Sequence, residues 1–473
     1  MKTIIGLEIH VELSTKTKMF CSCKNAFGQA PNTVVCPVCL GHLGTLPRPN
    51  KKAVEYAVMA GLAFDCDITK EMKFDRKKYY YPDLTKGFQI TQQDLPIATN
   101  GYLEIEGENG PKKVRIERIH MEEDTGKSTH TQDGHTLLDF NRAGVPLIEI
   151  VSKPDMESAE EARQFLENLR QRLKFIGVSD VKMEEGSLRC DVNINIKDDQ
   201  GNRSGIAEIK NLNSFRAVVR AIEHEEKRQA EMLAKGDPGT KETRRWDEAS
   251  GQTYLMRKKD EENDYRFTVE ADIPRIVLTD EYINEIKSKL PELPNAKKER
   301  YMDEYKLSEY DAKVLSQSKS IADLFENTIK EIDDPSLASN WIQTELMRRF
   351  KEYDIEPEQM KLSIENFARL LKLIKDKVIS NNVAKKVLRE IFDTNMDPVK
   401  YVEDNGLGQI SDDSFLEGLV TETLNENPQS IEDFKAGKDR ALGYLMGQIM
   451  KKSKGKANPQ QVNEMLREEL GKR

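Results

Sequence analysis

The sequence predicts an α+β fold in which a mixed region is followed by helices alone. Residues 1 to about 290 combine strand-like alternation with helical periodicity. After the P-E-L-P stretch at 291–294 the pattern is helical, with few glycines. Because 473 residues exceed one hydrophobic core, we expect roughly three domains. We place them at residues 1–292, 293–398 and 399–473, the last after a Pro- and Gly-containing break.

Two segments of the first region show the period-two alternation of half-buried strands. At residues 1–13, apolar side chains occupy the odd positions from Leu7 onward, and Glu8, His10 and Glu12 share the other face. Residues 182–196 repeat the pattern, with a polar face formed by Ser187, Arg189, Asp191, Asn193 and Asn195.

Two helices are predicted around the second strand. A capping box at Ser158–Glu161 begins the first, which ends near Gly177. The second runs from about Ser214 to Gly236. The first should bury Phe165, Leu169 and Leu173.

Composition indicates a cytoplasmic protein without a membrane partner. No apolar run approaches the length of a membrane span, and the N-terminus lacks a signal peptide. The formal charge of −9 argues against indiscriminate nucleic-acid binding but allows a local basic surface. The chain also lacks a G-x-S-x-G elbow and a Gly/Ser-rich amidase stretch, so any ammonia it uses must come from another protein.

Four of the six cysteines lie in C-S-C and C-P-V-C turns separated by twelve residues. Paired thiolates at this spacing suit tetrahedral Zn²⁺, and four of them leave no position open for water. The alternative is a set of free, reduced thiols, since the C-x-C half is less common than C-x-x-C. We predict a structural zinc knuckle at residues 21–39, with the ligands Cys21, Cys23, Cys36 and Cys39.

The stretch R-I-H-M-E-E-D-T-G-K-S, residues 118–128, ends like a P-loop but cannot be one. A P-loop needs a glycine where this chain has Met121. The stretch supplies acids instead, and another acid, Glu149, lies in the apolar run P-L-I-E-I-V, where an unpaired carboxylate is costly. Oxygen ligands favour Mg²⁺ or Mn²⁺. Candidate metal ligands are therefore Glu8, His10, Glu122, Glu123 and Glu149, although a solvated strand face is the alternative for the first strand.

Basic residues near these acids complete a set suited to phosphoryl transfer, which needs acids to hold Mg²⁺ and cations to neutralise the moving group. Each cation alone is more often a surface charge. The cationic candidates are Lys77 in F-D-R-K-K-Y-Y-Y-P-D, Arg189 in M-E-E-G-S-L-R-C-D and Lys210 in A-E-I-K-N-L-N-S-F. Glu185, in the same motif as Arg189, is a further acid of the set.

Six motifs in order along the chain closely resemble the GatB/GatE family of tRNA amidotransferase subunits. They are G-L-E-I-H-V-E-L, F-D-R-K-K-Y-Y-Y-P-D, H-M-E-E-D-T-G-K-S, V-P-L-I-E-I-V-S-K-P-D, K-M-E-E-G-S-L-R-C-D-V-N and E-I-K-N-L-N-S-F. The segment G-Y-L-M-G-Q-I-M-K-K-S-K-G-K-A-N-P resembles the family's YqeY-type tail domain.

This resemblance implies an antiparallel-sheet cradle related to glutamine synthetase, then a helical domain and a small helical tail. It implies a carbon–nitrogen ligase with glutamine as amido donor, working in the heterotrimer GatCAB. ATP and Mg²⁺ would phosphorylate the side-chain carboxylate of Glu-tRNA(Gln) or Asp-tRNA(Asn). An amidase-type glutaminase subunit would supply ammonia, and a small third subunit would hold the pair together.

Position by position, the resemblance assigns Mg²⁺ to Glu8, His10, Glu123 and Glu149, with Glu122 and Glu185 as close candidates. Lys77, Arg189 and Lys210 would address phosphates or developing charge. The family commonly reads D-Y-R-Y-F-P-E-P-D where residues 264–272 read D-Y-R-F-T-V-E-A-D, so the role of this segment stays open.

The tail has its own basic signal. Lys435–Lys456 carries seven Lys or Arg residues against one acid. Such a patch suits a tRNA backbone, and an amphipathic helix with a charged end is the alternative.

Two rival functions are a zinc-stabilised RNA-binding protein without catalysis and a free-standing ligase for small molecules. The complete acid and histidine set disfavours the first, and the helical domains with the basic tail disfavour the second. The archaeal relative GatE normally carries an inserted domain for which this chain is too short.

Overall fold

The computed structural model describes residues 1–108, 110–258, 265–408, 413–435, 438, 440–453 and 457–472. The chain divides into two compact units, Met1–Leu293 and Pro294–Arg473, which we describe separately. Among the described residues, no helix combines the length and apolar character needed to cross a bilayer.

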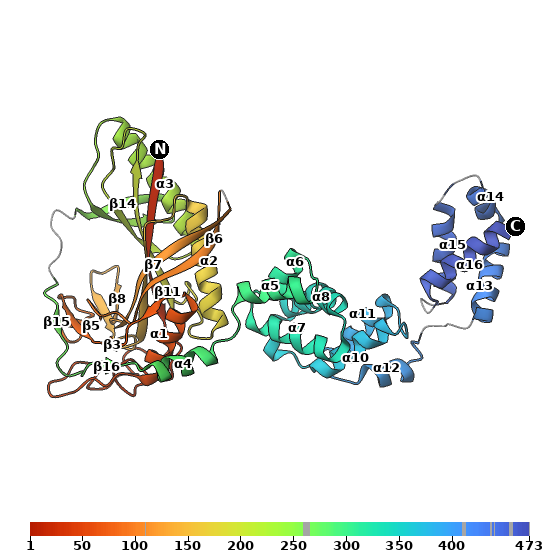
Figure 1. The fold of residues 1–473 in the computed structure, drawn as a ribbon, viewed down its shortest axis with the longest axis horizontal. Helices are drawn as coiled ribbons and strands as arrows, with labels where there is room; N and C mark the ends of the chain where they lie inside the picture. Colours follow the sequence, from red (N-terminus) through yellow and green to blue (C-terminus); the bar gives the residue numbers. More distant parts are fainter. Residues whose placement is uncertain are drawn as a thin grey trace. The chain divides into compact units, whose positions relative to one another are not determined.

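The first unit is built on a nine-stranded sheet with the order β14-β13-β12-β11-β1-β10-β7-β6-β2 (Figure 1). Neighbouring strands are antiparallel except β12 and β13, which are parallel because helix α3 connects them by a crossover. The predicted antiparallel sheet is therefore confirmed for every other pair. The strands are β1 Lys2–Glu12, β2 Asp67–Ile68, β6 Ala98–Gly107, β7 Gly110–Glu123, β10 Pro146–Ser152, β11 Leu188–Lys197, β12 Ala207–Leu212, β13 Glu242–Asp247 and β14 Gln252–Lys258.

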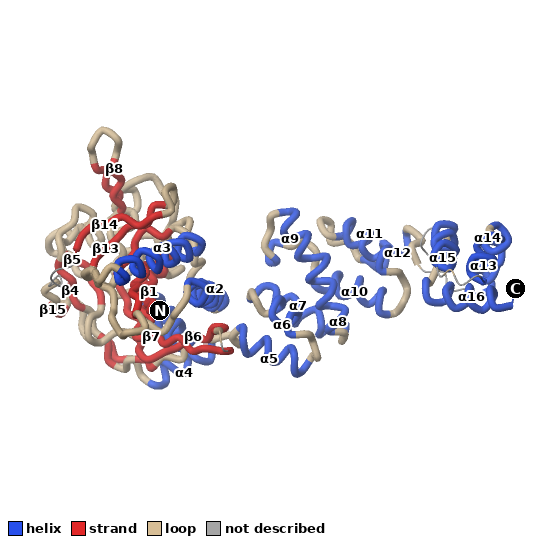
Figure 2. Tube along the Cα trace, turned by 90° about the horizontal axis from the view of Figure 1, so that it is seen from above, coloured by secondary structure: helices blue, strands red, loops and turns tan. Residues whose placement is uncertain are grey.

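In the described part of this unit, helices cover the apolar face of the sheet (Figures 1 and 2). Leu7, Ile9 and Val11 of β1 are buried in one hydrophobic cluster with residues of α1, α2 and α3. The polar side chains of β1 alternate with these apolar ones along the strand and point to the opposite face of the sheet. The helices of this unit are α1 Lys51–Ala63, α2 Ala159–Phe175, α3 Phe215–Ala234 and α4 Asp280–Lys289.

Short strands form three small sheets beside the large one. One of them, with the order β15-β4-β5, borders the polar face and supplies part of the cavity described below. These strands are β3 Glu71–Met72, β4 Asp75–Lys78, β5 Phe88–Thr91, β8 Lys127–His130, β9 Thr136–Asp139, β15 Thr268–Val269 and β16 Ile276–Val277.

Both helices predicted in this unit are confirmed. Ser158 caps α2 by accepting a hydrogen bond from the Glu161 N–H at 3.2 Å, and Ser214 caps α3. The capping box differs in its return bond, because the Glu161 carboxylate accepts from the N–H of Glu157 rather than from that of Ser158. The second strand was predicted to start at residue 182, which is wrong. Residues 183–186 form a turn, and β11 starts at Leu188.

The second unit is entirely helical in its described part. Its helices form two hydrophobic clusters, one up to Val402 and one from Leu416 onward. The helices are α5 Pro294–Glu304, α6 Glu309–Leu315, α7 Lys319–Ile332, α8 Pro335–Trp341, a π-helix Ile342–Leu346, α9 Met347–Tyr353, a 3₁₀ turn Pro357–Gln359, α10 Ile364–Lys375, α11 Asn381–Ile391, α12 Pro398–Asp404, α13 Asp413–Glu426, α14 Pro428–Lys435, α15 Arg440–Lys452 and α16 Pro459–Lys472.

The α+β class with a helical second half is thus confirmed. The domain boundaries stay predictions, and helix α12 bears on the last of them. It packs on α10 and α11, so the middle core continues past residue 398.

Candidate active site on the polar sheet face

Strand register brings four functional side chains into one row across the sheet. His10 on β1 lies opposite Arg189 on β11 and opposite Glu149 on β10. Glu149 in turn lies opposite His120 on β7. Directly opposed residues in neighbouring strands have their side chains in contact range, so segments far apart in sequence meet here.

His10 and His120 both contact Glu122 and Glu149. His10 Nε2 lies 3.2 Å from Glu122 Oε1 and 3.2 Å from Glu149 Oε2. His120 Nε2 lies 3.1 Å from the same Glu149 oxygen and 3.8 Å from Glu122 Oε2. The ligand atoms of His10, Glu122 and Glu149 all lie within 4.8 Å of one another, as a metal site requires. We call His10, His120, Glu122 and Glu149 the histidine–acid cluster.

Burial and charge set the protonation of this cluster. Burial opposes protonation of His10, but the Glu149 and Glu122 carboxylates outweigh it and raise its pKa to about 10. The same balance raises the pKa of His120 to about 9. Burial also disfavours ionised Glu122, yet hydrogen bonds from both histidines lower its pKa to about 2. Cation binding through His10 needs the neutral imidazole, so it is linked to proton release.

A second acidic cluster lies beside the first. Carboxylate oxygens of Glu8, Asp191 and Glu208 come within 4.8 Å of one another. Asn193 donates to Glu8 at 2.8 Å, and Lys210 Nζ lies 2.5 Å from Asp191 and 2.7 Å from Glu208. Burial, together with the charge of the neighbouring acids, raises the pKa of Glu8.

Both clusters, apart from the buried Glu122, line one cavity of about 630 Å³. Lys77 of β4 lies in its wall, with its ammonium 4.7 Å from the centre of the Tyr265 ring. Acids from the large sheet therefore face cations across a space that can hold a ligand. The other basic residues that line the cavity are Arg118, Lys241, Arg257 and Lys258, together with Lys210.

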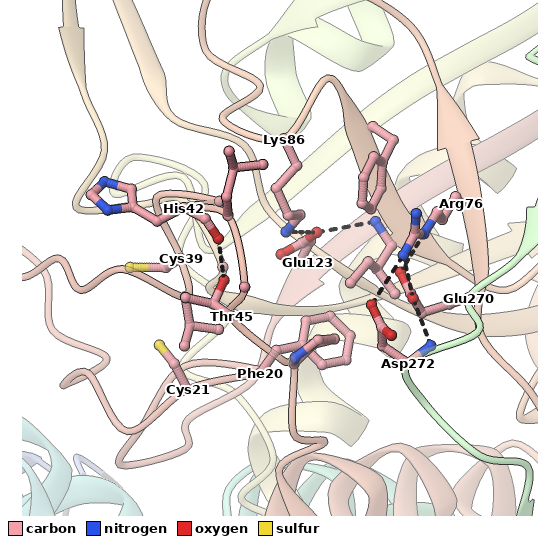
Figure 3. A pocket seen from close by; sticks show the side chains of 18 residues that line it. Phe20, Cys21, Cys39, His42, Thr45, Arg76, Lys86, Glu123, Glu270 and Asp272 are labelled. Atoms are coloured by element: carbon pink, nitrogen blue, oxygen red, sulfur yellow. Dashed lines mark hydrogen bonds and ion pairs between the residues drawn. The ribbon is translucent and has the colours of Figure 1, made fainter.

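Glu123 lies in a different cavity, so the structure does not bring it together with Glu8, His10 and Glu149. Consecutive strand residues point to opposite faces, and on β7 it is Glu122 that faces His10. Glu123 instead accepts from Lys86 at 2.5 Å and from the Ile90 N–H at 3.0 Å. Figure 3 shows this second cavity, of about 270 Å³, which is lined by Glu123, Lys86, Arg76, Glu270, Asp272 and two cysteines.

Two further predicted residues lie at the edge of the cluster or away from it. Arg189 stands beside His10 in the row, and its Nη2 lies 2.6 Å from Asp124 Oδ2. Glu185 occupies the turn before β11, is exposed, and pairs with Lys182 at 2.8 Å. The structure does not bring Glu185 to the cavity, because the predicted strand begins six residues later than expected.

The four clustered cysteines converge. Their Sγ atoms all lie within 4.8 Å of one another, and the Cys36 N–H donates to Cys39 Sγ at 3.2 Å. Lys18 is fully buried with its Nζ 3.6 Å from Cys39 Sγ. A hydrogen bond from Cys21 lowers the pKa of Cys39 to about 4. Four sulfur atoms that converge in this way suit a tetrahedral metal ion.

Sequence reasoning missed three residues of the two clusters. His120 stands two positions before Glu122, and Asp191 two positions after Arg189. Glu208 stands two positions before Lys210. Each shares a face with a residue that was named, so the period-two rule places it on the polar face, but strand register decides which residues meet there.

Two family models match the chain. Residues 3–284 match the family model of the GatB/GatE catalytic domain, and residues 323–470 match a model described as a GatB domain. The chain belongs to the GatB/GatE family. The resemblance drawn from the six motifs is therefore confirmed.

Among GatB/GatE relatives, three proteins named as the B subunit of aspartyl/glutamyl-tRNA(Asn/Gln) amidotransferase match along the whole chain. The chain is 58% identical over 471 residues to that of Finegoldia magna, covering 99% of this chain and 100% of the relative. It is 52% identical over 473 residues to that of Clostridium tetani, covering 100% and 99%. It is 49% identical over 476 residues to that of Thermotoga maritima, covering 99% of each.

Proposed function

We propose that this chain binds misacylated tRNA and uses ATP to activate its side-chain carboxylate within a glutamine-dependent amidotransferase. The observation that carries the proposal is that the histidine–acid cluster and the second acidic cluster share one cavity with Lys77 and Lys210. The full-length similarity to proteins named as B subunits of aspartyl/glutamyl-tRNA(Asn/Gln) amidotransferase supports it.

The donor set fits Mg²⁺, because hard carboxylate oxygens dominate it and the site lies open to a ligand. When bound, Mg²⁺ would neutralise charge on the phosphates of ATP. The proposed holders of one ion are His10, Glu122 and Glu149, and those of another are Glu8, Asp191 and Glu208.

In the proposed reaction a side-chain carboxylate oxygen of the esterified amino acid attacks the γ-phosphorus of ATP. The bond to the β–γ bridging oxygen breaks, and ADP leaves. Lys77 and Lys210 line the cavity and would offset charge on the transferred group. Ammonia then attacks the acyl carbon of the acyl phosphate, inorganic phosphate leaves, and the new nitrogen loses a proton to give the amide.

The proposed partners are those that the resemblance to the GatB/GatE family implies. In a GatCAB-type heterotrimer, an amidase-type glutaminase subunit would release ammonia from glutamine, and a small third subunit would hold the pair together. The reaction would take place in the cytoplasm, where tRNA is charged. The cysteine cluster would hold Zn²⁺ as a structural ion, since four thiolates complete its coordination.

The tail is proposed to bind the tRNA backbone. Helix α15 buries Leu442, Leu445 and Ile449 and places Lys451 and Lys452 in its last turn. Two of the seven basic residues of this segment, Lys454 and Lys456, and its one acid, Asp439, lie outside the described residues. Ending the chain near residue 400 should weaken tRNA affinity far more than ATP turnover per bound tRNA. Unchanged tRNA affinity would count against the proposal.

The decisive experiment follows the terminal phosphate of ATP. The assembled complex receives γ-labelled ATP with Glu-tRNA(Gln) or Asp-tRNA(Asn), while glutamine is withheld. The proposal expects label on the aminoacyl group together with ADP, and none with correctly charged Gln-tRNA(Gln) or Asn-tRNA(Asn). ADP formation that does not depend on the misacylated tRNA would reject it. The two tRNAs also report which amino acid is activated.

A further inference from the structure

Residues 265–272 form one wall of the active-site cavity. Tyr265 and Phe267 line this cavity beside Lys77.

Backbone pairing alone holds the wall weakly. Strand β15 has only two residues, paired with Asp75 and Arg76 of β4. Two further backbone hydrogen bonds flank it, from the Lys78 N–H to the Tyr265 carbonyl and from the Glu270 N–H to the Phe74 carbonyl, both at 2.9 Å. So short an edge strand gains little stability from its own ladder.

A buried ion pair supplies the stronger anchor. Arg76 donates from Nε and Nη2 to the two carboxylate oxygens of Glu270, each at 2.7 Å. Its Nη2 also lies 3.3 Å from Asp272, and its guanidinium lies 4.5 Å from the centre of the Phe88 ring. Glu270 is 1% exposed. Paired charge-assisted bonds fix both distance and orientation, and Figure 3 shows the three charged side chains together.

The geometry of β4 connects this anchor to the active-site cavity. Arg76 and Lys77 are consecutive strand residues, so they point to opposite sides. Arg76 lines the smaller cavity with Glu270, whereas Lys77 lines the larger one and meets the Tyr265 ring. Residues 265–272 are therefore held by Arg76 on one side of β4, and the ring of Tyr265 lies against Lys77 on the other side.

We propose that Arg76 and Glu270 are positioning residues whose ion pair holds residues 265–272 so that Tyr265 is set against Lys77 for nucleotide binding. Neither residue lines the larger cavity. The inference rests on the proposed function, in which Lys77 faces the phosphates of ATP.

The test uses Glu270→Ala and Arg76→Ala in the assembled complex. Binding of a non-hydrolysable ATP analogue is measured directly, and KM and kcat are measured for ATP with misacylated tRNA. Both variants should raise the Kd and KM for nucleotide about tenfold or more, with kcat at saturating ATP falling less than about threefold. Affinity for tRNA should not change.

The matched control is Arg275→Ala. It breaks the exposed Arg275–Glu71 ion pair of 2.8 Å, next to the β16–β3 pair, and touches neither cavity. Its nucleotide Kd should equal that of the wild type. If Glu270→Ala does not fold, Glu270→Gln keeps the side-chain volume and one acceptor oxygen, and it should still weaken nucleotide binding.

A double mutant separates positioning from general loosening. If Glu270 acts through the wall, adding Tyr265→Ala to Glu270→Ala should cause little further loss, so the two effects are not additive. Additive effects, or wild-type nucleotide affinity in folded Glu270 variants, would overturn the inference. Analogue binding needs no turnover, so this outcome is distinct from failure of the labelled-ATP experiment, which would reject the proposed function instead.

Discussion

The four cysteines, and His10, Glu122 and Glu149 of the histidine–acid cluster, each gather ligand atoms within 4.8 Å, but the two clusters are built in opposite ways. The cysteines come from two turns within residues 21–39 and need only local folding. The other cluster takes His10, Glu149 and the pair His120 and Glu122 from three strands that meet only when the sheet forms. The first can assemble before the sheet, whereas the second requires it.

The surroundings of the two clusters differ as much as their assembly. Four thiolates complete the coordination of a tetrahedral ion and leave no position for substrate. The histidine–acid cluster balances two carboxylates with two imidazoles and opens into a cavity lined by further cations. We therefore propose that the closed site stabilises the fold and that the open site carries the chemistry. The following variants test that division.

The largest effect should come from His10→Ala or Glu149→Gln. Each removes a metal ligand that also satisfies buried partners, so ATP-dependent amidation should fall about 10³-fold or more. Glutaminase activity of the complex and tRNA affinity should persist. The measurement is amide formation on misacylated tRNA. Glu117→Gln removes an exposed carboxylate of the same strand as His120 and should have no effect. Substantial amidation by His10→Ala would reject the open site.

The next effect distinguishes two neighbouring acids. Glu122→Gln should lower Mn²⁺ affinity about 10- to 100-fold, because Glu122 contacts His10 in the histidine–acid cluster. Glu123→Gln should leave Mn²⁺ affinity at the wild-type value, because Glu123 lies in the other cavity with Lys86. Titration of each variant with Mn²⁺ by calorimetry checks this. The reverse order would show that Glu123, not Glu122, is the ligand.

This pair also shows how far sequence reasoning reaches. The strand at Lys2–Glu12, helices α2 and α3 and the gathering of the cysteines could be predicted, because each signal is local. The period of β7 places Glu122 and Glu123 on opposite faces, but it does not say which face meets His10. That depends on the pairing of β7 with β10, which sequence periodicity does not give.

The second acidic cluster was harder still to predict. Glu8 and Asp191 meet through the register of β1 with β11. Glu208 joins them from β12, and a bulge between Cys190 and Val192 of β11 shifts the pairing of these two strands. A one-residue shift moves a whole strand face, so no local pattern could fix this contact.

In the cysteine cluster, Cys36→Ser should lower the stability of the fold. Loss of one thiolate should reduce bound zinc and lower the melting temperature by roughly 5–10 °C, because metal binding is coupled to folding. Zinc content by atomic absorption and a thermal melt check this. Cys66→Ser alters another buried cysteine outside the cluster and should leave zinc content unchanged. A full zinc complement in Cys36→Ser would contradict the four-thiolate site.

The smallest effect should come from Lys18→Met. Its ammonium lies 3.6 Å from Cys39 Sγ and donates to the Val34 carbonyl at 2.8 Å, so it offsets negative charge beside the thiolates without binding the metal. Zinc should remain bound, but chelator-driven release should be several-fold faster, and stability should fall by about 1–2 kcal/mol. Release kinetics and a denaturant titration measure both. Lys16→Met changes an exposed neighbour and should match the wild type. Complete zinc loss in Lys18→Met would mean that the buried cation, and not the thiolates alone, decides metal binding.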